Sequence, residues 1–91
     1  MSSRRLDMTI MGTVQGVGFR YYAYRIANDL GLVGWVRNLP DGRVQLAAEG
    51  MPEPLERLVQ DLSAGPSGAS VSDVEVKWSE PSGKFQSFDI Q

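Results

Sequence analysis

The fold is decided by the stretch from Leu6 to Gly31, which is LDMTIMGTVQGVGFRYYAYRIANDLG. Leu6, Met8 and Ile10 recur at every second position, which is typical of a strand with one buried face. After a glycine-bearing loop the apolar period changes to that of a helix, and Gly31 stands where a left-handed helix terminator is expected. The apolar positions of this helix are Phe19, Tyr22, Ala23, Ile26, Ala27 and Leu30.

The rest of the chain continues with short elements of both kinds. Strand-like segments flank a tight-turn signal and predict a β-hairpin, and prolines then open a second helix. The expected hairpin consists of a strand at 33–38, a turn at Pro40-Asp41-Gly42 and a strand at 44–49. The expected helix begins at Pro52 and Pro54 and ends at Gly65-Pro66, and its apolar side carries Leu55, Leu58, Val59 and Leu62. Two further strands are expected, one with Val74, Val76 and Trp78 and a short one with Phe85, Phe88 and Ile90.

This order is β-α-β-β-α-β with an extra terminal strand, and it predicts an α+β protein of the ferredoxin-like arrangement. Two helices with one apolar stripe each can cover one face of a four- to five-stranded antiparallel sheet and leave the other face in water. A chain of 91 residues has room for one domain, 1–91, of which we expect residues 1–4 to be flexible. The arrangement by itself indicates no activity.

Composition excludes several classes of function. The chain has no cysteine, which excludes disulfides and thiolate chemistry, and no histidine, which removes the commonest general base and metal ligand. No run approaches the roughly 20 apolar residues of a membrane span, and the N-terminus lacks the apolar core of a signal peptide. We therefore expect a cytoplasmic monomer that does not bind membranes.

The segment from Val14 to Arg20 carries the most informative pattern. Gly16 and Gly18 allow left-handed backbone conformations that turn successive N–H groups inward, and the loop runs into a helix N-terminus, which also favours anions. Arg20, in the first turn, could bind two oxygens of a phosphoryl group. The alternative is that both glycines only turn the chain and that Arg20 is solvated. A Walker loop and a dinucleotide fingerprint are excluded, since no lysine follows and Tyr21 stands where the third glycine is needed.

Asn38 is the second candidate, at the end of the strand 33–38. If the strands before and after the first helix are parallel, their carboxyl ends meet at one edge of the sheet, beside the glycine loop. The alternative is a turn residue whose side chain bonds to nearby backbone.

The remaining aromatic residues point to packing. Tyr21, Tyr22 and Tyr24 could form a stacking platform for bases, but they lie on a helix and the net charge is −2, so we expect no nucleic-acid binding. Trp35 and Trp78 lie on strands, where packing in the core or on a sheet face is the ordinary role.

Three blocks of this sequence resemble the signature blocks of acylphosphatases. They are GTVQGVGFR at 12–20, LGLVGWVRN at 30–38 and DGRV at 41–44. The similarity covers nearly the whole chain and includes the C-terminal Phe88-Asp89-Ile90. One departure is Met11, where many members carry a basic residue just before the first glycine.

The resemblance implies hydrolysis of small-molecule acyl phosphates to carboxylate and phosphate. In the family the arginine of the first block binds the phosphoryl group and the asparagine of the second orients the attacking water; by position these are Arg20 and Asn38. It also implies an enzyme without metal or cofactor, which fits a chain without histidine. The expected substrate-binding residues are Gln15, Gly16, Val17, Gly18, Phe19 and Arg20.

A binding module that uses the same loop without hydrolysis is the alternative. Such a module could be an accessory domain, like the acylphosphatase-like segment of a hydrogenase-maturation carbamoyltransferase. Because no zinc-finger or transferase segment follows in this sequence, we expect a stand-alone enzyme.

Overall fold

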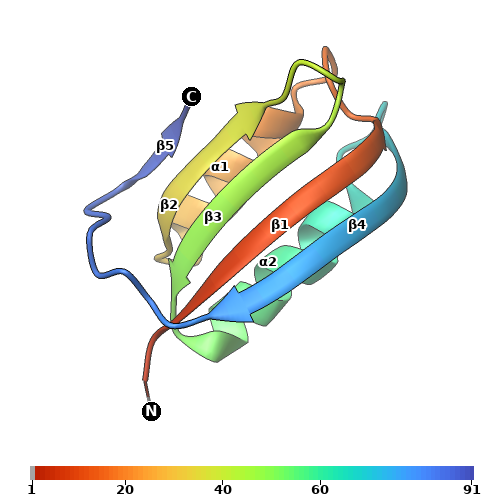
Figure 1. Cartoon of the computed structure of the whole chain (residues 1–91). Helices are drawn as coiled ribbons and strands as arrows, with labels where there is room; N and C mark the ends of the chain where they lie inside the picture. Colours follow the sequence, from red (N-terminus) through yellow and green to blue (C-terminus); the bar gives the residue numbers. More distant parts are fainter. Residues whose placement is uncertain (1) are drawn as a thin grey trace.

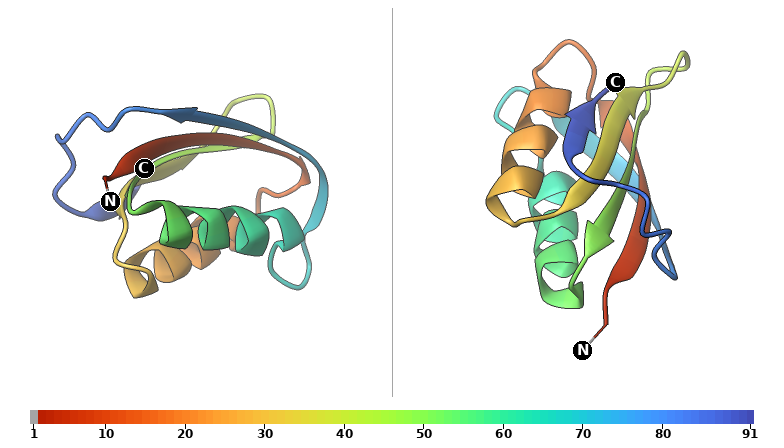
Figure 2. Two further views of the ribbon diagram at one scale, coloured as in Figure 1. Left: turned by 90° about the horizontal axis from the view of Figure 1, so that it is seen from below. Right: turned by 90° about the vertical axis from the view of Figure 1, so that its left-hand side faces the viewer.

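The computed structural model describes residues 2–91, which form two helices on one face of a five-stranded sheet (Figures 1 and 2). The elements are β1 (Arg4–Thr13), α1 (Phe19–Asp29), β2 (Val33–Asn38), β3 (Val44–Gly50), α2 (Pro52–Ala64), β4 (Ser70–Ser79) and β5 (Phe88–Ile90). The strand order in the sheet is β4-β1-β3-β2-β5. Within residues 2–91, neither helix has the length and hydrophobicity that spanning a membrane requires.

The ferredoxin-like α+β arrangement predicted from the sequence is confirmed. Strands β1 and β2 are both antiparallel to β3, so they run in the same direction and end at the same side of the sheet. β1 begins at Arg4, which pairs with Gly50, while Met1 of the segment expected to be flexible lies outside the described residues.

One strand departs from the expected antiparallel pattern. β5 pairs parallel to β2, with Val36 opposite Ile90, so the sheet is mixed. The reason is the long connection after β4, which crosses from one edge of the sheet to the other before β5 begins (Figure 1). The chain therefore returns in the direction of β2, and its last residues come to lie beside α1.

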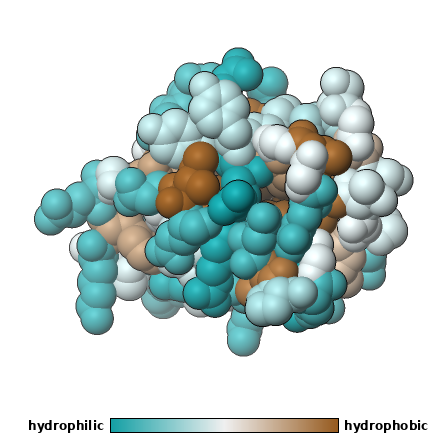
Figure 3. All heavy atoms as spheres, turned by 90° about the horizontal axis from the view of Figure 1, so that it is seen from above, coloured by the Kyte–Doolittle hydropathy of each residue, from teal (hydrophilic) through white to brown (hydrophobic). Residues whose placement is uncertain are grey.

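The core lies between the sheet and the helices. The alternating residues of β1 are at most 1% exposed, and the stripe of α1 buries Phe19, Ala23 and Ala27 against them. At the edge strand β4 the coverage is incomplete: Val76 and Trp78 face the helical side, opposite buried residues of β1, but are each 38% exposed. Seen from the end that carries the C-terminus, the surface is mainly hydrophilic with separate apolar patches (Figure 3).

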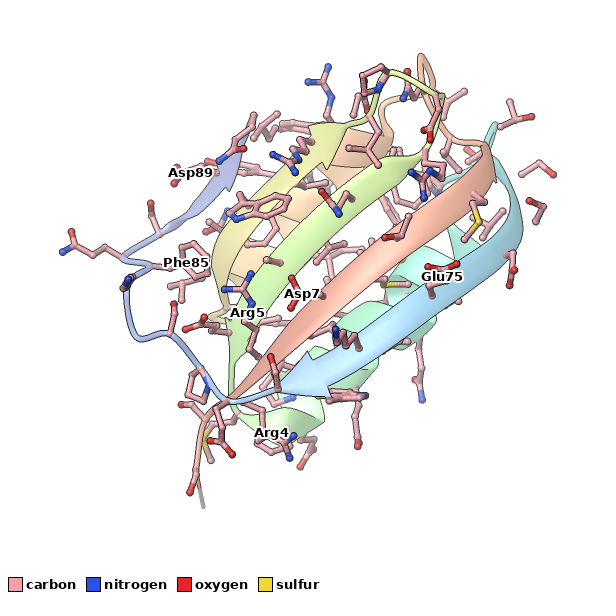
Figure 4. The ribbon with its side chains drawn as sticks, in the orientation of Figure 1. Arg4, Arg5, Asp7, Glu75, Phe85 and Asp89 are labelled. Atoms are coloured by element: carbon pink, nitrogen blue, oxygen red, sulfur yellow. The ribbon has the colours of Figure 1, made fainter. Side chains whose placement is uncertain are left out.

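Glu49 is the buried carboxylate of the described chain, only 4% exposed, and it anchors the connection between β4 and β5. Its carboxylate accepts hydrogen bonds from the Ser82 N–H at 2.8 Å, the Ser82 hydroxyl at 2.7 Å and the Gly83 N–H at 3.0 Å. The Arg5 guanidinium lies 3.6 Å from the same carboxylate. It packs on the Phe85 ring and also donates a hydrogen bond to Asp7, so Arg5 stands between these two residues (Figure 4). The crossing segment is thus fixed to the open face of the sheet, and β5 is held in place.

We expect Glu49→Gln to destabilise the fold in a pH-dependent way. Burial raises the pKa of Glu49, but the hydrogen bonds from Ser82 and Gly83 and the charge of Arg5 outweigh it, so the pKa lies below its ordinary value. A lowered pKa stabilises the fold above the unfolded-state pKa, and this contribution is lost as the pH falls through the folded-state pKa. The variant should lose about 1–3 kcal/mol of unfolding free energy at neutral pH.

Urea unfolding of both proteins at pH 7 and pH 3 checks this expectation. The difference between them should shrink at pH 3, because this pH lies below the ordinary pKa of 4.5, so that the Glu49 carboxylate is largely protonated in the unfolded chain. Glu56→Gln, at an exposed position of α2, is the matched control and should change stability by less than about 0.5 kcal/mol. An undiminished difference at pH 3 would show that the charge of Glu49 is not what anchors the segment.

Candidate active site

The loop between β1 and α1 owes its shape to two glycines. Gly16 and Gly18 both have φ of 76°, in the left-handed region that other residues avoid. A Cβ atom at either position would meet nothing within 4 Å, so the glycines are required by backbone conformation and the space above them is open. Gly18 is also the N-cap of α1, and no side chain caps this helix end.

The backbone N–H groups of this loop are free to bind a ligand. None from residue 15 to residue 21 donates to a backbone or side-chain acceptor within residues 2–91. The first turn of α1 contains no acidic residue, so nothing on the helix itself neutralises its positive end. The loop is therefore a group of unpaired donors at a helix N-terminus, where the potential favours an anion.

Arg20 adds a full positive charge to this end of the helix. Its Nη1 atom donates a hydrogen bond to the main-chain oxygen of Gln91 at 2.8 Å, which ties the side chain to the end of β5. Within residues 2–91 no Asp or Glu side chain forms an ion pair with Arg20. The guanidinium is thus oriented by the backbone that follows β5 and not by an acidic side chain.

The strand register decides on which face of the sheet the Asn38 side chain lies. It is paired with buried Val44 at the end of β2, two residues after buried Val36, so its side chain lies on the helix-covered face. Arg37 lies on the opposite face, over the Trp35 ring at 4.7 Å. Among residues 2–91 the Asn38 amide has no hydrogen-bond partner within the chain, which speaks against a purely local turn role.

A cavity of about 210 Å³ brings the two candidate side chains together. Arg20 is the one charged side chain that lines it within the described residues. The lining residues are Val14, Gly16, Gly18, Phe19, Arg20, Tyr21, Asn38 and Ile90.

Two of the predicted substrate-binding residues have side chains directed elsewhere. Gln15 donates from Nε2 to the carbonyl oxygens of Leu39 at 2.7 Å and Arg43 at 2.9 Å, which fastens the loop to the β2–β3 turn. Val17 packs against the core. At these two positions, only the backbone N–H is available to a ligand.

Three residues that line this cavity were not among the predicted site residues. Val14, at the start of the predicted loop, is an inner-wall residue, only 1% exposed, and Tyr21 follows Arg20 on α1. Ile90, like the main-chain oxygen of Gln91, arrives through the parallel pairing of β5. The period-2 pattern of Phe88 and Ile90 was the available signal, but it carried no information about which strand β5 would join.

The sequence is similar to those of known proteins over nearly its whole length. The model of the Acylphosphatase family matches residues 6–90. An acylphosphatase of Thermococcus kodakarensis is 52% identical over 83 residues, covering 91% of both chains, and one of Trichormus variabilis is 47% identical over 87 residues, covering 96% of this chain and 85% of the relative.

Solved structures show the same relationship. The crystal structure of acylphosphatase from Bacillus subtilis superposes with a TM-score of 0.94 at 35% identity, covering 97% of this chain and 98% of the other. Full-length HypF, in its phosphate- and nucleotide-bound form, has a TM-score of 0.87 at 25% identity; the match covers 99% of this chain and 12% of HypF. The family match and these identities show that the chain belongs to the acylphosphatase family of hydrolases.

Proposed function

We propose that this acylphosphatase cleaves the carboxyl–phosphate bond with the phosphoryl group bound by Arg20 and the loop N–H groups, and with water oriented by Asn38. The observation that carries the proposal is their convergence on one small cavity: unpaired N–H donors, a guanidinium that pairs with no acidic side chain of residues 2–91, and a carboxamide without a partner in that range. The ligand class that fits this set is a tetrahedral anion next to a site for water.

The donors suit a phosphoryl group for electrostatic reasons. Its oxygens accept charge-assisted hydrogen bonds from the planar guanidinium, which are roughly twice as strong as neutral ones. The N–H groups from Gln15 to Arg20 can supply further donors at a helix N-terminus. Because Gly16 and Gly18 fix the conformation of this loop, little reorganisation would accompany binding.

In the proposed reaction the oxygen of water attacks phosphorus as the bond from phosphorus to the acyl oxygen breaks. The electron pair of that bond leaves with the carboxylate, whose conjugate acid has a pKa near 4, so no residue must protonate it. The proton of water passes to a phosphoryl oxygen, and the products are carboxylate and phosphate. The transition state is loose, which makes positioning and electrostatic stabilisation the main contributions of the protein.

Asn38 has the chemistry of an orienting group. A carboxamide can accept one hydrogen bond from water and donate others, but it is too weak a base to remove the proton. Its contribution is to hold the nucleophile in line with the bond that breaks. No metal or cofactor is part of the proposed reaction.

Hydrolysis of benzoyl phosphate, followed spectrophotometrically, tests the proposal. We expect turnover well above the buffer rate, with inorganic phosphate as a competitive inhibitor because it occupies the phosphoryl site. A protein that binds phosphate without hydrolysing the substrate would instead be a binding module. Turnover insensitive to phosphate would place the reaction outside this cavity.

A further inference from the structure

The rim of the cavity is apolar, in contrast to its donor groups. Five large hydrophobic side chains of the described residues are exposed, and two of them, Tyr21 at 59% and Ile90 at 40%, line this one cavity. The inner walls are formed by Val14 and Phe19, which are 1% and 2% exposed. From this end of the molecule, apolar atoms are seen next to hydrophilic ones (Figure 3). Exposed apolar surface beside a binding cavity favours a ligand that covers it.

Both rim residues are held in place by the fold. The Tyr21 ring stacks on the Tyr24 ring with centroids 6.2 Å apart and planes at 23°, and Tyr24 packs against the core. Ile90 is paired in register with Val36, and Phe88, two residues earlier, is buried and fixes the strand. The rim therefore offers a preformed aromatic face and an aliphatic side chain, at little entropic cost to a ligand that packs on them.

Charge limits what else can bind there. Arg20 is the one charged side chain lining the cavity in the described chain, and the proposed reaction uses it for the phosphoryl group. A second anionic group on the ligand would find no cation. The volume of about 210 Å³ is also below the roughly 300 Å³ at the lower end for drug-sized ligands, so the ligand is small.

We infer that Tyr21 and Ile90 form a subsite for the acyl group, and that the enzyme favours acyl phosphates with an uncharged aromatic or bulky apolar acyl group. This inference rests on the proposed function, because the phosphoryl group held by Arg20 directs the acyl group toward the rim. Tyr21 is a specificity residue here, since it contacts the part of the substrate that does not react. The stacked aromatic pair supplies the selectivity, and Ile90 adds apolar contact on the other side.

The test compares kcat/KM for benzoyl phosphate with that for acetyl phosphate, which has the same reacting bond and no ring. Tyr21→Ala should lower the benzoyl-to-acetyl ratio by about 3- to 10-fold, as expected from loss of one stacked aromatic contact. Tyr21→Phe retains the ring and should retain the ratio. Ile90→Ala should lower it less, by about 2- to 3-fold.

Two controls separate this role from a structural one. Inhibition by inorganic phosphate should be the same in Tyr21→Ala as in the unmodified protein, because phosphate has no acyl group. Met51→Ala removes another exposed apolar side chain, 36% exposed and outside the cavity lining, and should leave the ratio unchanged.

Equal losses with both substrates, or an unchanged ratio in Tyr21→Ala, would overturn the subsite while leaving the proposed hydrolysis intact. A protein that hydrolyses neither substrate would overturn the proposed function and, with it, the subsite.

Discussion

Arg20→Ala is expected to abolish turnover and phosphate inhibition together. The guanidinium is the one charged side chain that lines the cavity among residues 2–91, and no Asp or Glu side chain of that range pairs with it. Arginines that act on a transferring phosphoryl group contribute about 10³- to 10⁵-fold to the rate, and kcat/KM for benzoyl phosphate should fall on that scale. The inhibition constant of inorganic phosphate, measured with the residual activity or by calorimetry, should rise beyond the accessible range.

The same helix offers a matched control for charge. Arg25 is exposed on α1 and does not line the cavity, so Arg25→Ala removes one positive charge without touching the site. It should leave kcat/KM within about twofold, as for a surface charge screened by solvent. Arg20→Lys keeps the charge but loses the planar fork, and we expect it to restore only part of the loss. Phosphate inhibition retained in Arg20→Ala would remove this residue from the binding site.

Asn38→Ala should lower kcat by about 10²- to 10⁴-fold, the range for lost positioning of a reactant, while phosphate still binds. The amide has no hydrogen-bond partner within residues 2–91 and lies on the helix-covered face with the cavity. Its loss therefore removes an orienting group and leaves the anion donors in place. Steady-state kinetics with benzoyl phosphate, with phosphate as inhibitor, separates the two effects.

Two further variants test whether the effect of Asn38→Ala comes from the loss of this particular amide. Asn28→Ala removes an exposed amide on α1 that bonds to the Tyr24 carbonyl, and it should leave kcat unchanged. Asn38→Asp has nearly the same shape but places a negative charge near the phosphoryl group, so KM should rise as well. A rise in KM with kcat preserved in Asn38→Ala would contradict the water-orienting role and assign the residue to ground-state binding.

Local patterns were sufficient to predict the framework and to place Arg20 and Asn38 near each other, as the cavity that both line confirms; their roles in the reaction stay predictions. The change of period between Ile10 and Phe19 predicted β1, the loop and α1, because strand and helix periodicities are read directly from a short segment. Asn38 could be placed near the loop because β1 and β2 had to be parallel around a crossover helix, and the register of β3 with both strands agrees. These inferences need only residues that are close in sequence and the rule that a crossover helix connects two parallel strands.

What the sequence did not disclose depends on distant contacts. β5 joins β2 in parallel because the connection after β4 crosses the sheet, and this connection is fastened by Glu49, a residue more than 30 positions before Ser82 in the chain. Ile90 and the Gln91 main-chain oxygen reach the cavity through this crossing and the pairing of β5 with β2. The exposure of Val76 and Trp78 likewise depends on how far α2 extends over the edge strand. Periodicity carries no information about such placements.

The backbone origin of the anion donors has a consequence for how such an enzyme can diversify. In the proposed mechanism the peptide N–H groups shaped by Gly16 and Gly18 belong to the backbone, so substitutions that keep these two glycines and Arg20 leave the phosphate end of the substrate untouched. The rim, in contrast, consists of side chains. Substrate range can therefore drift at Tyr21 and Ile90 while the reaction itself is preserved, and a laboratory effort to retarget the enzyme should randomise those two positions first.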